Sequence, residues 1–257
     1  MIKTLQCLLA CLLLFTTHSL TAEETTLVAV ASSFAPVAEE LSQQFLKDTG
    51  KPIRLSAGAT GTLTRQIQRG APFELFLSAD EDHVYLLERE GFTLDTGKIY
   101  AVGVLVLFIP YTTRLDRMQN ISDMILELVS GESLRLALAN PDTAPYGRAA
   151  REVLHRFHPG VTGTHEIIGE NAGQVARFAL TGNVDAAMIP LSLALDKDMQ
   201  SAGHFEFIPA EWYSPVRQRM VLIQNAGTTA RAFFNFIGSK TAQQVMQKYG
   251  YTLPEGE

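Results

Sequence analysis

The stretch Thr26-Leu27-Val28-Ala29-Val30-Ala31, followed by Ser32-Ser33-Phe34-Ala35-Pro36, sets a pattern that recurs along the whole chain. Its first six residues are apolar or β-branched, which indicates a buried strand. Small polar residues come next, with Ser33 placed to cap a helix and Pro36 in the first helical turn. Apolar residues at helical spacing then continue to about Asp48. The stretch therefore predicts a strand, a short polar loop and a helix.

The same order of elements repeats outward from this stretch. Further strands are predicted at 53–56, 75–78, 101–109, 134–138, 166–168, 186–189, 205–208 and 219–224. Helices are predicted at 33–48, 63–69, 81–90, 121–129, 146–157, 173–180, 229–236 and 241–249. Strands that alternate with helices favour an α/β architecture with largely parallel sheets. No linker rich in proline or glycine divides the chain, so two lobes would require more than one crossing between them.

The first 22 residues differ from the rest of the chain. A positive start at Lys3 is followed by the apolar run 5–15 and by small residues up to Ala22. This is the layout of a secretory signal peptide, and the expected cleavage follows Ala22. The apolar run is too short for a membrane-spanning helix, which needs about 20 residues. We therefore expect a soluble protein that is exported to the periplasm.

Both cysteines, Cys7 and Cys11, lie inside this leader. Neither a disulfide framework nor thiol chemistry is therefore expected in the exported protein. The residues before Cys11 weakly resemble a lipoprotein processing site, but the apolar run continues beyond Cys11 instead of ending there. Cleavage after Ala22 is the preferred interpretation.

The composition limits the classes of function. The chain has 257 residues, of which 46% are apolar and 19% charged, so it can bury a sizeable core. It holds 21 basic and 27 acidic residues, a formal charge of −6, which becomes −7 when the leader with Lys3 is removed. No basic run is present, which argues against a surface for nucleic acid or an anionic membrane. The acidic balance by itself also argues against an anionic ligand.

Four loops share one local design, in which small polar residues or glycine lie between a strand and a helix start. They are Ser32-Ser33-Phe34-Ala35-Pro36, Gly58-Ala59-Thr60-Gly61-Thr62, Asn140-Pro141-Asp142-Thr143-Ala144-Pro145-Tyr146-Gly147 and Gly169-Glu170-Asn171-Ala172-Gly173. A helix N-terminus leaves about four N–H groups unpaired, so it can bind an anion without a full positive charge. In α/β sheets such loops gather at the carboxyl ends of the strands. Together they predict a neutral cage for a small oxyanion, although the same turns also occur in α/β proteins without a ligand.

The order and spacing of several segments resemble the periplasmic molybdate-binding proteins of ABC transporters, which are type II periplasmic substrate-binding proteins. The segments are Val30-Ala31-Ser32-Ser33-Phe34, Gly58-Ala59-Thr60-Gly61, Gly70-Ala71-Pro72-Phe73-Glu74-Leu75-Phe76-Leu77-Ser78-Ala79-Asp80, Ala144-Pro145-Tyr146-Gly147 and Gly182-Asn183-Val184-Asp185-Ala186-Ala187. The resemblance extends from about residue 25 to 252. It implies a two-lobed α/β fold with the ligand cleft between the lobes. We expect residues 23–102 and 215–257 in the first lobe and residues 103–214 in the second.

The resemblance also implies which residues bind the oxyanion. Ser33 matches a ligand in the first loop, and Ser32 matches a residue that contributes in one branch of the family. Tyr146 matches the ligand tyrosine of the branch that carries Ala-Pro-Tyr-Gly. Ala172 matches a position that donates through its backbone N–H, so its side chain matters little.

Two positions depart from the family pattern. Thr60 falls where the family usually has serine, and its additional methyl group could alter the size of the cavity. Pro190 stands where another branch has a ligand tyrosine, a role for which Tyr146 would substitute. Both departures leave the identity of the anion open.

Other residues have simpler interpretations. His155 and His158 lie three apart on a predicted helix, a spacing that could hold a metal ion, but no cysteine or acidic partner accompanies them. We expect a packed or exposed pair and no direct metal ligands. Asp80 and Glu81 are expected to cap a helix, and Trp212 is expected to pack in the core or at a hinge.

The function implied by the resemblance is capture of molybdate, with tungstate as a further ligand, for import by the membrane permease of an ABC transporter. One alternative is another small oxyanion, such as sulfate or chromate, or a small organic acid. A secreted enzyme on the same fold is disfavoured because no Gly-x-Ser-x-Gly motif is present. We expect a monomer that is not an enzyme, binds no nucleic acid and has no cofactor beyond the bound oxyanion.

Overall fold

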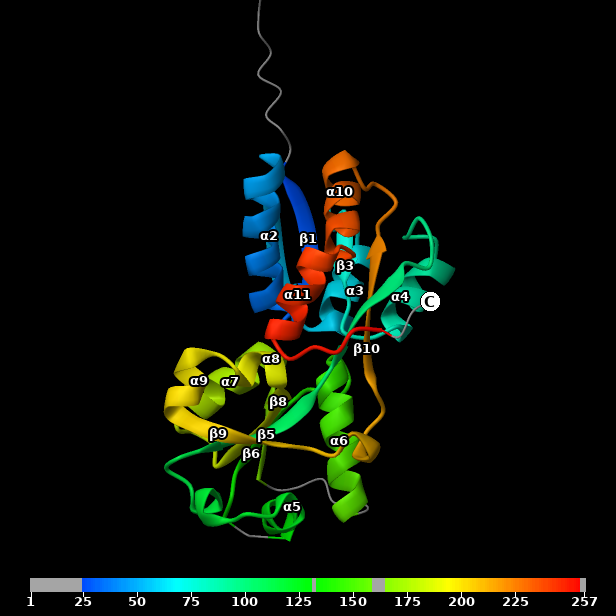
Figure 1. Ribbon diagram of the computed structural model, residues 1–257. Helices are drawn as coiled ribbons and strands as arrows, with labels where there is room; N and C mark the ends of the chain where they lie inside the picture. Colours follow the sequence, from blue (N-terminus) through cyan, green and yellow to red (C-terminus); the bar gives the residue numbers. More distant parts are fainter. Residues whose placement is uncertain (1–24, 131–132, 159–164, 255–257) are drawn as a thin grey trace, which may run out of the picture.

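The computed structural model describes residues 25–130, 133–158 and 165–254. These residues form two five-stranded sheets with helices packed on them, one above the other in Figure 1. Each sheet with its helices is called a lobe below. The expected signal peptide and both cysteines lie outside the described residues. Within the described ranges, no helix combines the length and the apolar character needed to cross a bilayer.

The first lobe has a sheet with the strand order β2-β1-β3-β10-β4. The strands are β1 (Thr26–Ala31), β2 (Ile53–Gly58), β3 (Leu75–Leu77), β4 (Lys98–Gly103) and β10 (Val216–Leu222). Both faces are covered, one by α2 (Ala35–Thr49), α10 (Thr228–Ile237) and α11 (Lys240–Lys248), and the other by α3 (Thr60–Gln68) and α4 (Asp82–Arg89). Successive side chains of a strand point to opposite faces, so Val28 and Val30 pack under α2 while Ala29 packs toward α3.

The second lobe has a sheet with the strand order β7-β6-β8-β5-β9. The strands are β5 (Leu105–Pro110), β6 (Leu136–Ala139), β7 (Glu166–Gly169), β8 (Ala186–Pro190) and β9 (Gly203–Phe207). One face packs against α5 (Ile121–Ser130) and α6 (Pro145–Phe157), and the other against α7 (Ala172–Leu180), α8 (Leu191–Ala194) and α9 (Lys197–Ala202). Short 3-10 turns occur at Arg114–Arg117 and Ala210–Trp212. Each lobe therefore has its own two-sided core.

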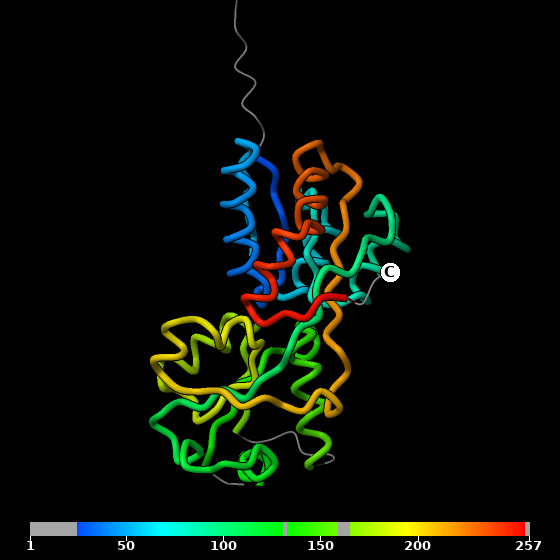
Figure 2. The backbone as a smooth tube through the Cα atoms, viewed as in Figure 1, coloured from blue at the N-terminus to red at the C-terminus, as the bar shows by residue number. Residues whose placement is uncertain are grey.

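The chain passes from the first sheet to the second between β4 and β5 and returns before β10, as the tube in Figure 2 shows. The prediction of one strand over 101–109 is wrong, because β4 ends at Gly103 and β5 begins at Leu105 in the other sheet. Residues on both sides of this break are buried and apolar, so the sequence pattern does not mark it. The domain boundaries near residues 103 and 215 stay a prediction.

Both sheets are mixed, so the prediction of largely parallel sheets is wrong. Strand β1 pairs in parallel with β2 and β3, whereas β10 runs antiparallel to β3 and β4. In the second sheet, β6 pairs in parallel with β7 and β8, and β5 runs antiparallel to β8 and β9. The parallel strands end toward the other lobe. Strands β5 and β10 begin there, directly after the chain has crossed, and therefore run in the opposite direction.

Candidate functional site

A small cavity lies between the lobes, where the parallel strands end. The first lobe contributes the residues that follow β1, β2 and β3, and the second contributes those that follow β6 and β7. Its lining residues are Ala31, Ser32, Ser33, Gly58, Ala59, Thr60, Ala79, Ala144, Pro145, Tyr146 and Ala172. The structure thus brings all five residues of the expected oxyanion site to one cavity: Ser32, Ser33, Thr60, Tyr146 and Ala172.

The size and lining of this cavity restrict its ligand. Its volume of about 10 Å³ is close to the minimum that holds one water molecule. The lining contains hydroxyl, backbone and small apolar groups and no charged side chain. A ligand of several atoms therefore requires the lobes to separate slightly, and its recognition must rely on hydrogen bonds.

The Ser33 hydroxyl is the most informative group in the cavity. Among the described residues, it is the one buried polar side-chain atom without a hydrogen-bond partner. The prediction that Ser33 caps a helix is wrong, since α2 begins at Ala35 with Phe34 as its N-cap residue and no side-chain cap. A buried polar group without a partner costs about 1–3 kcal/mol. A buried hydroxyl without a partner inside a cavity indicates a ligand that accepts a hydrogen bond from it.

The other three hydroxyls of the cavity share one arrangement, because each accepts a hydrogen bond from an N–H group. The pairs are Gly173 N–H with Ser32 Oγ (3.4 Å), Ala79 N–H with Thr60 Oγ1 (3.3 Å) and Gln218 Nε2–H with Tyr146 Oη (3.2 Å). An N–H group donates and cannot accept, so each hydroxyl keeps its own proton to donate. The arrangement is suited to a ligand whose outer atoms are all acceptors.

Backbone donors complete the set. Helix α7 begins at Ala172, after an N-cap at Asn171 whose side chain accepts from the N–H of Gln174 at 3.1 Å. The first N–H groups of a helix have no partner within the helix, and the partial positive charge of the dipole lies at this end. Helices α3 and α6 also begin at the cavity wall, with Thr60 and Pro145. Three helix N-termini therefore face the same small volume.

Tyr146 remains a donor at neutral pH. Burial raises the pKa of its hydroxyl well above the usual value, and the neighbouring Tyr251 raises it further. Burial likewise raises the pKa of Tyr100, with Tyr251 as the second cause. These phenols keep their protons throughout the physiological pH range.

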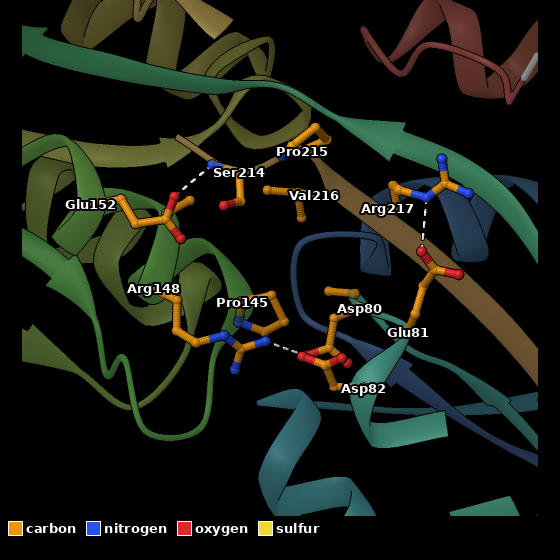
Figure 3. Close-up of a pocket in the computed structure, with 12 residues that line it drawn as sticks. Asp80, Glu81, Asp82, Pro145, Arg148, Glu152, Ser214, Pro215, Val216 and Arg217 are labelled. Carbon is orange, nitrogen blue, oxygen red and sulfur yellow. Dashed lines mark hydrogen bonds and ion pairs between the residues drawn. The ribbon is translucent and has the colours of Figure 1, made fainter. Parts of the chain in front are cut away.

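A larger cavity of about 260 Å³, whose lining is drawn in Figure 3, lies next to the small one. The two cavities share the lining residues Ala79 and Pro145. The charged lining residues of the larger cavity are Asp80, Glu81, Asp82, Glu152, Arg148 and Arg217. The two guanidinium groups bind carboxylates of this lining, Arg148 binding Asp80 and Arg217 binding Glu81. With four carboxylates around it, this cavity is unfavourable for an anion.

Asp80 joins the lobes at this larger cavity. Its carboxylate binds the Arg148 side chain of the second lobe and the His83 ring at 2.8 Å within the first. Burial raises the pKa of Asp80, but the contacts with His83 and Arg148 outweigh this effect, so the net pKa is lowered.

The expected capping role is confirmed for Asp80, which accepts from the His83 N–H at 3.2 Å at the start of α4. It is wrong for Glu81, which binds Arg217 and Arg219 instead.

Further hydrogen bonds cross between the lobes beside the small cavity. The Gly61 N–H donates to the Thr143 carbonyl at 2.8 Å, and a Cβ at position 61 would lie 3.2 Å from the Thr143 Cα. The Ser192 hydroxyl of the second lobe donates to the Ser33 carbonyl at 2.8 Å. The two lobes are therefore in direct contact around the site.

The chain matches the protein family described as bacterial extracellular solute-binding protein over residues 26–252. It belongs to that family. The match covers nearly all of the described residues, in both lobes. This solute-binding protein is therefore a member of a family that binds solutes outside the cytoplasm and not of an enzyme family.

Curated relatives of this solute-binding protein cover almost its whole length. The molybdate-binding protein ModA of Azotobacter vinelandii is 34% identical over 230 residues, which are 88% of this chain and 89% of the relative. The ModA protein of Rhodobacter capsulatus is 33% identical over 231 residues, 88% of this chain and 87% of the relative. The solved structure of the periplasmic molybdate-binding protein of Azotobacter vinelandii aligns with a TM-score of 0.80 at 29% identity, covering 90% of this chain and all of that one. The predicted two-lobed α/β fold is confirmed.

Sequence reasoning missed residues that hold the expected ligand residues in place. Gln218 donates to Tyr146, and the hydroxyls of Ser192 and Tyr251 each lie 2.8 Å from the Ser33 carbonyl. They come from segments far along the chain and carry no local motif. Pro190, which the sequence places where a ligand tyrosine occurs in another branch, ends β8 two residues before Ser192.

The remaining expectations concern residues outside the cavity. In the part of the chain that the structure describes, no three His, Cys, Asp or Glu side chains are grouped as a metal site, and the expectation that His155 and His158 are not metal ligands stays a prediction. Trp212 packs against the core of the second lobe, with its ring 4.9 Å from that of Phe157 in an edge-on contact. The core interpretation of Trp212 is confirmed.

Proposed function

We propose that this solute-binding protein captures molybdate, with tungstate as a second ligand, and delivers it to the membrane permease of an ABC importer. The observation that carries the proposal is the buried Ser33 hydroxyl, which lacks a partner in a cavity whose other hydroxyls all accept from N–H groups. Molybdate is a tetrahedral dianion whose four oxygens are acceptors, so it matches this set of donors. The names of the similar proteins from Azotobacter vinelandii and Rhodobacter capsulatus support the same ligand.

The binding residues in this proposal are the side chains of Ser32, Ser33, Thr60 and Tyr146 and the backbone N–H of Ala172. None is charged, so the negative charge of the ligand is balanced by oriented O–H and N–H dipoles and by helix N-termini. Hydrogen bonds to a charged group contribute about 1.5–3 kcal/mol each. A few such bonds can therefore hold a dianion tightly.

A site made only of donors also discriminates between anions. Phosphate near neutral pH carries at least one proton, and its O–H group needs an acceptor. A buried donor without an acceptor costs about 1–3 kcal/mol, which weakens binding by roughly 5- to 150-fold. Molybdate, tungstate and sulfate are fully deprotonated at that pH and escape this penalty.

The cycle follows from the two lobes. They are residues 23–102 with 215–257, and 103–214, and they close around the anion. The permease binds the closed form, because only that form presents both lobes in a fixed relative position. The protein works as a monomer in the periplasm after its signal peptide has been cleaved behind Ala22.

Sulfate is the second candidate ligand. The small volume of the cavity favours it, together with the methyl group that Thr60 adds to the cavity wall. Sulfate has the same tetrahedral shape and four acceptor oxygens as molybdate, but its bonds are shorter.

Calorimetric titration of the purified chain 23–257 with molybdate, tungstate, sulfate and phosphate tests the proposal. We expect one molybdate per chain, comparable binding of tungstate and no heat of binding with phosphate. Binding of sulfate without either metal oxyanion would replace molybdate by the second candidate. Absence of binding to all four anions would overturn the oxyanion function.

A further inference from the structure

Gln218 connects the cavity to a chain of buried hydroxyl groups. It lies on β10 of the first lobe, is 0% exposed, and its Nε2 lies 3.2 Å from the Tyr146 hydroxyl of the second lobe. Its Oε1 accepts from the Tyr100 hydroxyl at 2.9 Å, and the same hydroxyl lies 3.1 Å from the Ser78 carbonyl. The amide is thus held on both sides by tyrosines.

The direction of these hydrogen bonds decides what Tyr146 can offer to a ligand. While Tyr100 donates to Oε1, the amide presents its NH₂ group to Tyr146, and the Tyr146 proton is left for another acceptor. If the amide were rotated by half a turn, Oε1 would accept the Tyr146 proton. Only the lone pairs of the Tyr146 hydroxyl would then point toward the cavity, and they would repel an oxyanion.

Tyr251 belongs to the same buried group of hydroxyls. Burial raises the pKa of Tyr251 to about 12, and contacts with Ser192, Gln218, Tyr146 and Ser33 act against this rise. The Tyr251 hydroxyl has its own acceptors, because it lies 2.8 Å from the Ser33 carbonyl and 3.1 Å from Ser192 Oγ. The contact that orients the Gln218 amide is the one with Tyr100, whose hydroxyl donates to Oε1 at 2.9 Å.

The backbone also makes room for this arrangement. A Cβ added to Gly103 would lie 1.8 Å from the Tyr146 hydroxyl and 3.0 Å from Gln218 Nε2. Glycine at the end of β4 thus allows the hydroxyl and the amide to meet against the main chain. A residue with a side chain at position 103 would collide with the Tyr146 hydroxyl and the Gln218 amide in this place.

We propose that Gln218 is a positioning residue that fixes the Tyr146 hydroxyl as a hydrogen-bond donor and so makes the cavity select anions without a proton. The inference rests on the proposed capture of an oxyanion and adds the residue that sets its selectivity. Gln218 acts through Tyr146 and is not in the cavity lining. Tyr100 fixes the orientation of the amide in turn.

The Gln218→Glu variant reverses the direction of the bond with almost no change in shape. A carboxylate at this position accepts the Tyr146 proton, so we expect tungstate to bind at least 100-fold more weakly than to the unmodified protein at about pH 8. Burial raises the pKa of a carboxyl group, and the protonated form again donates to Tyr146. The affinity for tungstate should therefore recover as the pH falls to about 5.5. A variant that binds weakly because its structure is disturbed would not regain affinity in this way.

Three further variants separate positioning from packing. Gln218→Met fills the space without hydrogen bonds, and we expect about a tenfold loss of tungstate affinity that does not change with pH. Tyr100→Phe frees the amide to rotate and should weaken tungstate binding about three- to tenfold, although Tyr100 does not line the cavity. Gln224→Glu is the matched control, since Gln224 donates to the Thr93 carbonyl at 2.7 Å and lies outside the cavity lining. The affinity of this variant for tungstate should match that of the unmodified protein.

The titration uses the chain 23–257 with tungstate at about pH 5.5, 7 and 8, after thermal unfolding has shown that each variant is folded. The titratable groups found against Gln218 are the hydroxyls of Tyr100, Tyr146 and Tyr251, all with a raised pKa, so the unmodified protein should show no such pH profile. If the Gln218→Glu variant binds tungstate as tightly as the unmodified protein, or equally weakly at every pH, the inference about Gln218 is overturned. The proposed function would not be affected by that result. If that variant does not fold, unchanged affinity of Tyr100→Phe overturns the inference. Failure of the unmodified protein to bind any oxyanion would overturn the proposed function as well.

Discussion

The Ser33 hydroxyl combines two properties that rarely occur together in a folded protein, because it is buried and it has no hydrogen-bond partner. Its own backbone carbonyl is held by Ser192 and Tyr251, so the residue is fixed in place while its side chain is left unpaired. Because this hydroxyl has no partner, the protein without ligand is less stable than it would be with the hydrogen bond made. A ligand that accepts a hydrogen bond from Ser33 removes this cost when it binds.

Replacing Ser33 by alanine should therefore separate stability from binding. We expect the free energy of unfolding without ligand to stay unchanged or to rise by up to about 1 kcal/mol, since an unpaired polar atom is removed. The affinity for molybdate should fall by roughly 10- to 100-fold as one bond to a charged ligand is lost. Thermal unfolding and calorimetry on the same samples measure both quantities. Ser201→Ala, at an exposed serine of α9, is the control, and a parallel loss of stability and affinity in Ser33→Ala would contradict the account.

At the scale of elements, the loop between β3 and α4 contacts α6 across the cleft through the Asp80–Arg148 ion pair. Exposed ion pairs contribute about 0–1 kcal/mol, and Arg148 is 36% exposed, so a small contribution to closure is expected. Arg148→Met should raise the dissociation constant of molybdate about two- to fivefold without changing its stoichiometry. Arg151→Met is the matched control, because Arg151 binds Glu166 at 2.7 Å within the second lobe. Equal effects of the two substitutions would show that the pair between the lobes does not assist closure.

The contacts of Asp80 with His83 and Arg148 make the stability of the protein depend on pH with a defined sign. The net pKa of Asp80 in the folded protein lies below its ordinary value of 3.8. Ionised Asp80 therefore stabilises the fold fully above that ordinary value, and the stabilisation is lost as the pH falls through the folded-state pKa. The melting temperature of the unmodified protein should exceed that of Asp80→Asn by a constant amount above about pH 5 and by less below pH 3.8. A difference that grows on acidification would contradict this assignment.

At the scale of elements, local patterns predict the regular strands and helices but not where the chain changes sheet. Apolar runs such as Val28 to Ala31 identify strands, and Gly50, with a φ of 72°, ends α2 where the pattern predicts. The break at Val104 escapes this reasoning, because Leu105 is as buried as Ala101 and a buried run looks alike in either sheet. The short helices α8 and α9 also escape it, since four and six residues are too few to show a period.

The candidate site is predictable to a different extent. The residues that face the cavity, such as Ser33 and Tyr146, lie in or directly after loops with a recognisable order of small and polar residues. The residues behind them do not, because Gln218 is 72 positions from Tyr146 in the chain and Ser192 is 159 from Ser33. Such contacts depend on how two lobes pack, which no local pattern contains.

At the scale of the whole molecule, the acidic charge and the anionic ligand are compatible. The sequence carries a formal charge of −6, while the cavity lining is neutral, so the proposed binding does not require an excess of basic residues. Surface charges are screened over about 8 Å at physiological salt. Carboxylates on the surface that lie farther than this from the cavity therefore contribute little to the binding of an anion.

The response to salt should reflect this. Between about 0.05 M and about 0.5 M sodium chloride, we expect the affinity for molybdate to stay constant or to rise by up to about threefold, because salt screens the repulsion. A site built on arginine or lysine would instead lose affinity with added salt. Calorimetry at three salt concentrations measures the slope, and a decrease of tenfold or more would indicate a cationic site outside the small cavity.

The central claim is that a neutral cavity between the lobes holds a tetrahedral oxyanion by donors alone. It is tested most directly by a crystal structure of the protein with molybdate, in which the anomalous scattering of molybdenum locates the ion. We predict one peak between the lobes, with oxygens within about 3 Å of Ser33 Oγ, Tyr146 Oη and the Ala172 nitrogen. A peak in the larger, acid-lined cavity, or one beyond hydrogen-bond distance of Ser33 and Tyr146, would contradict the account.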